Sequence, residues 1–231
     1  GHSTTLICLG AFILWIGFLA FNGGSELKVS GGSVYTVGVV IVNTIMANVG
    51  GGLTVLAIVY VREKRVSLLG SVNGTLGGMV AICAGCNVVE PWAALVIGVV
   101  AGATYYVWSN LMLHFKIDDP VDAVAVHLGC GFWGMLARPI FEKDGIIYSF
   151  SEAAWKRFGM NLGGELVIIA WTAGLCFPMF YALKRAGLLR VDEATELEGL
   201  DLKKHGEISY PVESNVVANV LILDSSELPD E

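Results

Sequence analysis

The sequence predicts an all-α membrane protein, a polytopic bundle of apolar helices followed by an acidic tail. Charged residues make up only 15% of the 231 residues and hydrophobic residues 55%, whereas a soluble globular chain carries about 25% charged residues. The apolar residues gather in segments close to the roughly 20 residues that cross a bilayer as a helix. The short alternating segments of a membrane β-barrel are largely missing.

Polar and glycine-rich breaks divide the apolar sequence into candidate helices. Asn22–Ser25 and Gly31–Ser33 bracket a short loop. Asp118 and Asp119 supply capping carboxylates before Pro120, which suits a first helical turn. We therefore expect a membrane domain over residues 1–184, with six helices at about Thr4–Asn22, Val34–Val61, Leu68–Gly85, Trp92–Leu113, Pro120–Ala137 and Leu162–Lys184.

The remaining residues, 185–231, are expected to form an acidic tail in solvent, which accounts for much of the net charge of -7. No basic aromatic patch indicates a nucleic-acid partner. More Lys and Arg residues lie on the side of the predicted membrane domain that holds both chain ends. The positive-inside rule therefore predicts that both ends, and the tail, are cytosolic.

His127 is the residue most indicative of function, because it lies near the middle of a predicted membrane helix. An ionisable group at that depth is costly and usually faces a cavity or pathway. The alternative is a neutral histidine bonded to a neighbouring helix. Around it, Gly129, Gly131 and Gly134 reduce the bulk of the helix, which suits a narrow passage.

Other candidate residues have plain structural explanations when taken alone. Phe18 and Phe21 could form an aromatic constriction, but packing or contact with lipid explains them better. Ser25 offers a hydroxyl beyond them. Asp122 is explained by helix capping, and Glu165 by a place in the first turn of the last helix.

Nothing in the sequence indicates a nucleophile with its base, a phosphate loop or a metal site, so we expect no enzyme, cofactor or metal. Cys83 and Cys86 have the spacing of a redox or zinc half-motif, but without a second pair, buried free thiols are favoured. Asn43, Asn48 and Asn73 lie within predicted helices and are expected to bond across helices. Because the chain begins with glycine, we expect a fragment or a processed product.

Several ordered strings resemble the ammonium transporter/Rhesus family. The most specific, Asp118–Gly134, is similar to the family's tenth helix. The others resemble its sixth, seventh and eighth helices and its cytosolic C-terminal segment, in that order: Phe12–Ser25, Val42–Thr44, Asn73–Cys86 and Leu189–Tyr210.

The resemblance implies the second half, helices six to eleven, of an eleven-helix inverted-repeat fold. It implies a homotrimer in the plasma membrane that moves ammonium or ammonia through one pore in each subunit. It assigns His127 and Phe21 to the pore, Ser25 and Phe18 to an outer recruitment site, and Asp122 to the cytosolic vestibule.

The resemblance also implies that the first pore histidine belongs to helices that this sequence does not contain. We therefore expect no closed pore from this chain alone. Arg138, Glu142 and Lys143 are polar where relatives are more apolar. The alternative function is an ammonium sensor or a regulatory partner of full-length subunits.

Overall fold

The computed structural model describes residues 3–206, and within that range it leaves out the side chains of Glu198 and Leu202. The chain divides into two units, Gly1–Ile169 and Ala170–Glu231, each considered by itself. Residues 207–231, with most of the predicted tail and its short apolar stretch Val216–Leu223, lie outside the described residues.

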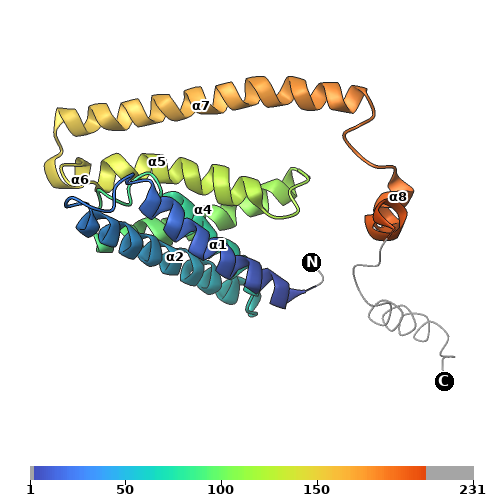
Figure 1. The fold of residues 1–231 in the computed structure, drawn as a ribbon, viewed down its shortest axis with the longest axis horizontal. Helices are drawn as coiled ribbons and strands as arrows, with labels where there is room; N and C mark the ends of the chain where they lie inside the picture. Colours follow the sequence, from blue (N-terminus) through green and yellow to red (C-terminus); the bar gives the residue numbers. More distant parts are fainter. Residues whose placement is uncertain (1–2, 207–231) are drawn as a thin grey trace. The chain divides into compact units, whose positions relative to one another are not determined.

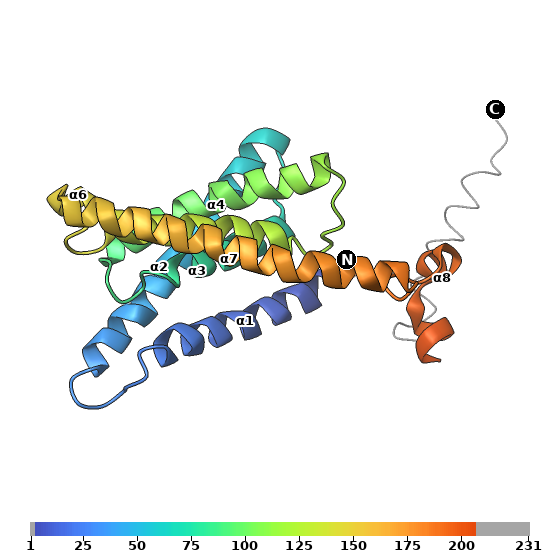
Figure 2. The ribbon, with the colours of Figure 1, turned by 90° about the horizontal axis from the view of Figure 1, so that it is seen from above.

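The first unit is a bundle of helices (Figures 1 and 2). A π-helical turn, η1, leads directly into α5. Five helices of the described chain are long and apolar enough to span a membrane, and α3 is a shorter apolar helix. The fold class predicted from the sequence is confirmed. The elements are α1 (Thr4–Gly24), α2 (Val34–Glu63), α3 (Leu68–Ile82), α4 (Pro91–His114), η1 (Val124–Gly129), α5 (Cys130–Phe141), α6 (Ile146–Ser149) and α7 (Glu152–Arg185).

The fifth membrane helix begins later than expected. Pro120 lies in a turn rather than in a first helical turn, and η1 begins at Val124. Two features of the backbone explain the shift. Asp122 takes a left-handed conformation with φ 57°, which interrupts a helix. The Asp119 carboxylate then accepts hydrogen bonds of 2.8 Å from the backbone N–H groups of Ala123 and Val124.

The last membrane helix begins earlier than expected. α7 starts at Glu152, so the segment before the predicted start is divided among the end of α5, the short α6 and the first turns of α7. Glu165 therefore lies well inside α7, where it is buried, and the expectation that it occupies a first turn is wrong. One of its carboxylate oxygens has no hydrogen-bond partner among the described residues.

Helices α2, α3 and α4 approach one another through glycine. A Cβ atom built on Gly74 of α3 would lie 2.8 Å from the Gly51 carbonyl oxygen of α2. A Cβ atom on Gly102 of α4 would lie 2.5 Å from the same oxygen. Real Cβ atoms essentially never come that close, so the backbones of these helices touch, as small residues allow in membrane bundles.

Amide side chains make polar contacts between elements of the bundle, as predicted. Asn43 of α2 donates to the carbonyl oxygens of Cys86 and Val89 at 2.9 and 2.8 Å, beyond the end of α3. Asn48 of α2 donates to the Met79 sulfur of α3 at 3.5 Å. These bonds cross between elements, and unpaired amides would be costly in an apolar interior.

The polar residues near the end of α5 form an ion-pair cluster with the start of α7. The buried Glu142 accepts from Arg157 at 2.5 Å and pairs with Arg138 at 3.5 Å. Asn161 of α7 donates to the Met135 carbonyl oxygen of α5 at 3.1 Å. The cluster gives a structural reason for polar residues at the end of α5, where relatives are more apolar, because its ion pair and hydrogen bond join the first turns of α7 to α5.

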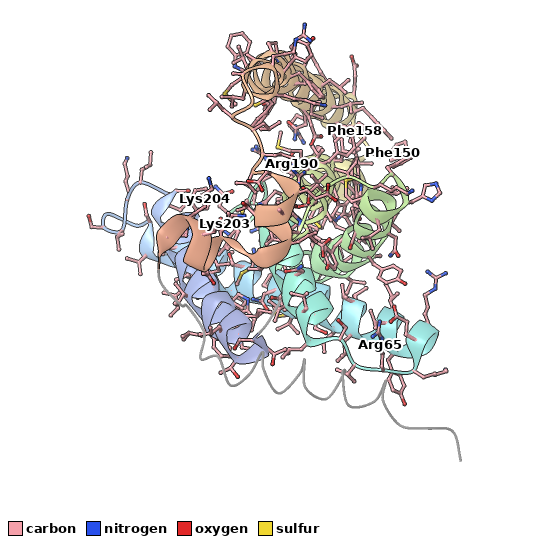
Figure 3. All side chains as sticks on the ribbon, turned by 90° about the vertical axis from the view of Figure 1, so that its right-hand side faces the viewer. Arg65, Phe150, Phe158, Arg190, Lys203 and Lys204 are labelled. Carbon is pink, nitrogen blue, oxygen red and sulfur yellow. The ribbon has the colours of Figure 1, made fainter. Side chains whose placement is uncertain are left out.

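An aromatic cluster marks the start of α7, where Figure 3 labels Phe150 and Phe158. Trp155 meets both rings edge to face, with centroid distances of 5.5 and 6.0 Å. Aromatic side chains of this kind are enriched where a membrane helix leaves the hydrocarbon.

The second unit holds the end of α7 and two short turns, α8 (Glu193–Glu198) and η2 (Asp201–His205). Figure 3 labels Arg190, Lys203 and Lys204 in this segment. Asp192 caps α8: the Thr195 hydroxyl and backbone N–H donate to its carboxylate at 2.7 and 2.9 Å. These two bonds hold the pKa of Asp192 below its usual value.

Candidate functional site

Two cavities of the first unit meet at His127. The first has a volume of about 390 Å³ and an almost wholly apolar lining. The second has about 440 Å³. His127 and Leu14 line both cavities, so the imidazole lies at their boundary. Besides these two residues, the first is lined by Gly17, Phe18, Phe21, Val80 and Cys83, and the second includes Asn73, Pro120, Val121, Asp122 and Val126.

The π-helical turn η1 presents His127 to the cavities. In this turn Ala125, Val126 and Gly129 are buried, whereas His127 is exposed in the structure of this chain. A Cβ atom on Gly129 would lie 2.7 Å from Cγ of Trp108, so this glycine lets η1 lie directly against α4. The opposite side of the turn then faces α1 and α3. Single π-helical turns occur frequently at functional sites.

Asp122 forms the polar wall of the second cavity. Its carboxylate accepts from the Tyr105 hydroxyl at 2.8 Å, the Ser109 hydroxyl at 2.9 Å and the Asn73 amide at 3.2 Å. The interpretation of Asp122 as a helix cap is wrong, because the capping carboxylate belongs to Asp119. Asp122 has a left-handed backbone conformation, and its carboxylate bonds to side chains of α3 and α4.

Of the residues predicted at the end of the site opposite Asp122, two line a cavity and one does not. Phe18 and Phe21 line the first cavity together with His127. Ser25 is absent from the described lining of both cavities. Its hydroxyl donates at 2.7 Å to the Phe21 carbonyl oxygen one turn earlier. The structure thus brings four of the predicted residues to the two cavities and leaves Ser25 beyond them.

The sequence interpretation overlooked Tyr105 and Ser109. They stand four residues apart on α4, so they share one face of that helix. Tyr105 is only 4% exposed, and a buried hydroxyl needs a partner. Two polar residues at helical spacing in an apolar segment indicate a shared polar partner. The sequence does not show that this partner is Asp122, which lies outside α4.

The first cavity favours solutes that form hydrogen bonds over bare ions. Its walls are apolar, and a bare ion loses most of its solvation energy in such surroundings. A neutral imidazole, by contrast, both donates and accepts one hydrogen bond. No group of His, Cys, Asp and Glu side chains suited to a metal ion occurs in the described part of the chain.

Comparison with known proteins shows the same family over nearly the whole chain. Residues 1–210 match the model of the Ammonium Transporter Family. A Caenorhabditis elegans protein named as an ammonium transporter 1 is 43% identical over 226 residues, covering 92% of this chain and 42% of that protein. Ammonium transporter 1 member 1 of Solanum lycopersicum is 36% identical over 231 residues, covering 91% of this chain and 47% of that protein. The chain spans about half the length of the curated relatives it matches.

Solved structures agree with this result. The protein described as "Sensor Amt Protein" superposes with a TM-score of 0.79 and 35% identity, covering 88% of this chain and 49% of that one. Mep2 of Saccharomyces cerevisiae superposes with a TM-score of 0.73 and 29% identity, covering 82% of this chain and 46% of that one.

Proposed function

Because this chain belongs to the ammonium transporter family, we propose that it supplies half of a pore that moves ammonium or ammonia across a membrane. The single observation that carries the proposal is the place of His127 at the boundary of two cavities. An imidazole between an apolar cavity and one with a carboxylate wall is suited to handle a hydrogen-bonding solute in a region that excludes bare ions.

The proposed selectivity rests on hydrogen bonding rather than on size. Ammonium and potassium have similar radii and the same charge, so a pore width does not separate them. Ammonium donates directed hydrogen bonds and can release a proton, and potassium does neither. An apolar cavity at Phe18 and Phe21 penalises both bare ions, and His127 then offers a hydrogen bond only to the nitrogen species.

The flanking residues have roles at the two ends of this path. We assign Phe21 to the outer gate, and Phe18 and Ser25 to an outer recruitment site. Ser25 contributes from outside the cavities, where its hydroxyl retains acceptor capacity while it donates to Phe21. Asp122 lies at the opposite, cytosolic end, where its carboxylate attracts a cation leaving or entering the second cavity.

The complete pore is proposed to require the other half of the family fold. His127 and Phe21 are exposed in the structure of this chain, which supports a further set of helices covering the site. We further propose a homotrimer in the plasma membrane with a cytosolic C-terminus. The distribution of Lys and Arg among the loops supports that orientation.

Replacing His127 with alanine should lower transport while leaving the protein folded. The change removes a side chain that lines two cavities and one hydrogen bond to the solute, which corresponds to about a tenfold loss of rate. The measurement is methylammonium uptake by yeast that lack their own ammonium transporters and express the full-length protein containing this chain. Surface amounts are compared by membrane labelling.

Leu128→Ala is the matched control, because Leu128 lies on the same turn but is absent from the described lining of both cavities. It should transport normally. If His127→Ala retained both its uptake and its preference for ammonium over potassium, His127 would have no role in the pore.

A second candidate function is ammonium sensing, because the structural neighbour with a TM-score of 0.79 is named as a sensor. A sensor would bind ammonium and change the activity of a co-expressed partner without moving the solute. Uptake by the full-length protein in transporter-free yeast would contradict this alternative. Absence of uptake, together with an ammonium-dependent effect on a partner, would support it.

A further inference from the structure

Tyr105 of α4 is buried behind the candidate site, and it is absent from the described lining of both cavities. A Cβ atom built on Gly77 of α3 would lie 3.7 Å from Cβ of Tyr105 and 2.8 Å from the Cys130 sulfur. The Cys130 thiol, at the start of α5, donates at 3.4 Å to the Ala101 carbonyl oxygen, one turn before Tyr105 on α4. Helices α3, α4 and α5 thus meet at Tyr105, and its packed ring fixes the place of its hydroxyl.

The Tyr105 hydroxyl joins two polar side chains that line the second cavity, Asn73 and Asp122. It donates to Oδ2 of Asp122 at 2.8 Å and accepts from the Asn73 amide at 3.3 Å. The Asn73 amide also lies 3.2 Å from the same carboxylate oxygen, and the Ser109 hydroxyl donates to the other oxygen at 2.9 Å. Both oxygens of the carboxylate are therefore held by donors of α3 and α4, which sets its orientation.

The backbone of Asp122 is bonded to the turn that carries His127. The Asp122 carbonyl oxygen accepts from the Val126 backbone N–H at 2.9 Å, and Val126 directly precedes His127 in η1. Asp122 is thus bonded through its side chain to Tyr105 and through its backbone to η1. A displacement of Asp122 would therefore be transmitted to the residue next to His127.

We propose that Tyr105 is a positioning residue for transport. Its hydroxyl holds the Asp122 carboxylate at the second cavity and, through the bond from Asp122 to Val126, the turn that carries His127. The inference rests on the proposed transport function, and it adds a residue that lines neither cavity. A phenol suits this role, because its ring supplies packing and its hydroxyl a directed hydrogen bond. A small displacement of a positioned group is enough to lower a rate.

Tyr105→Phe tests the inference, because it removes the hydroxyl and keeps the ring. Methylammonium uptake is measured against concentration in transporter-free yeast that express the full-length protein containing this chain. The maximal rate per surface molecule should fall about fivefold, the effect of one lost hydrogen bond. The half-saturating concentration should stay within about twofold, because Phe18 and Phe21, which line the first cavity, are unchanged. A lower surface amount with an unchanged rate per molecule would show a role in stability alone and overturn the inference.

Tyr106→Phe is the matched control. Tyr106 is the next residue of α4, but its hydroxyl accepts from Arg62 at 3.4 Å, and it is absent from the described lining of both cavities at His127. This variant should keep the maximal rate and the half-saturating concentration of the unmodified protein. Equal losses in the two variants would reflect the removal of any phenol hydroxyl from α4, and they would overturn the role given to Tyr105.

Combining Tyr105→Phe with Asp122→Asn tests whether Tyr105 acts through Asp122. If it does, the loss of rate in the double variant is smaller than the product of the two single losses. Single losses that multiply in full would overturn the inference. Absence of uptake by the unmodified protein would instead contradict the proposed transport function. In that case SDS unfolding of the same variants applies: the double variant should shift by less than the sum of the single shifts, and additive shifts would overturn the inference.

Discussion

Replacing Gly78 with valine should strongly destabilise the bundle. Gly78 lies on the face of α3 that touches α2, and a Cβ atom there would overlap the Ala47 carbonyl oxygen. A Cβ atom on Gly98 of α4 would overlap Ala47 as well, so α2 cannot move away from α3 without meeting α4. The obstacle is helical backbone on both sides, and no side-chain rotation relieves it.

The expected loss of unfolding free energy is at least about 3 kcal/mol, the upper range for overpacking in a well-packed interior. Measurement would use SDS-induced unfolding of the purified protein, with size-exclusion chromatography to detect aggregation. Gly78→Ala should already be destabilised, because its single Cβ atom makes the same clash. Valine has a higher helix propensity than glycine, so helix propensity does not account for such a loss.

Gly38→Val provides the control within the same bundle. Gly38 is on α2, and a Cβ atom there has nothing within 4 Å among the described residues. This variant should unfold at nearly the same SDS concentration as the unmodified protein. Equal stability of the Gly78 and Gly38 variants would mean that α2 and α3 are not in backbone contact.

The glycine contacts show how far the sequence alone could go. In the sequence, Gly74 with Gly78, and Gly98 with Gly102, have the four-residue spacing of small residues that is typical of close helix approach, although the abundance of glycine explains each pair nearly as well. The structure places Gly51 opposite Gly74 and Gly102. That pairing depends on the register between helices, and local spacing carries no information about register.

The candidate site, too, could be predicted only in part. The depth of His127 in an apolar segment was enough to single it out. The neighbouring aspartates were not distinguishable, because both precede a helix and carboxylates there usually cap. The left-handed backbone at Asp122 decides between them, and its partners come from α3 and α4. The start of α7 is not predictable from hydrophobicity, because polar residues such as Arg157 interrupt the apolar segment. In the structure, Arg157 lies within α7 and is paired with Glu142.

Replacing Asp122 with alanine should produce the second large effect. The carboxylate accepts three hydrogen bonds, from Tyr105, Ser109 and Asn73. Tyr105 and Asn73 are 4% and 7% exposed, so without the carboxylate their donors lose an acceptor in a place that water reaches poorly. A hydrogen bond to a charged group contributes about 1.5–3 kcal/mol. The expected total is about 3–5 kcal/mol, since the three bonds share one carboxylate and do not add fully.

Two further variants separate the hydrogen-bond network from the charge and from the helix start. Asp122→Asn keeps an acceptor for Tyr105 and should cost about 1 kcal/mol. Asp119→Ala removes only the cap of the same helix and should also cost about 1 kcal/mol. In SDS unfolding, Asp122→Ala should therefore be clearly less stable than either Asp122→Asn or Asp119→Ala. If Asp119→Ala were the more damaging change, the helix start would be the main support of this end of the bundle. The wall of the second cavity would then hold its shape without Asp122, leaving attraction of the cation as the only role for that carboxylate.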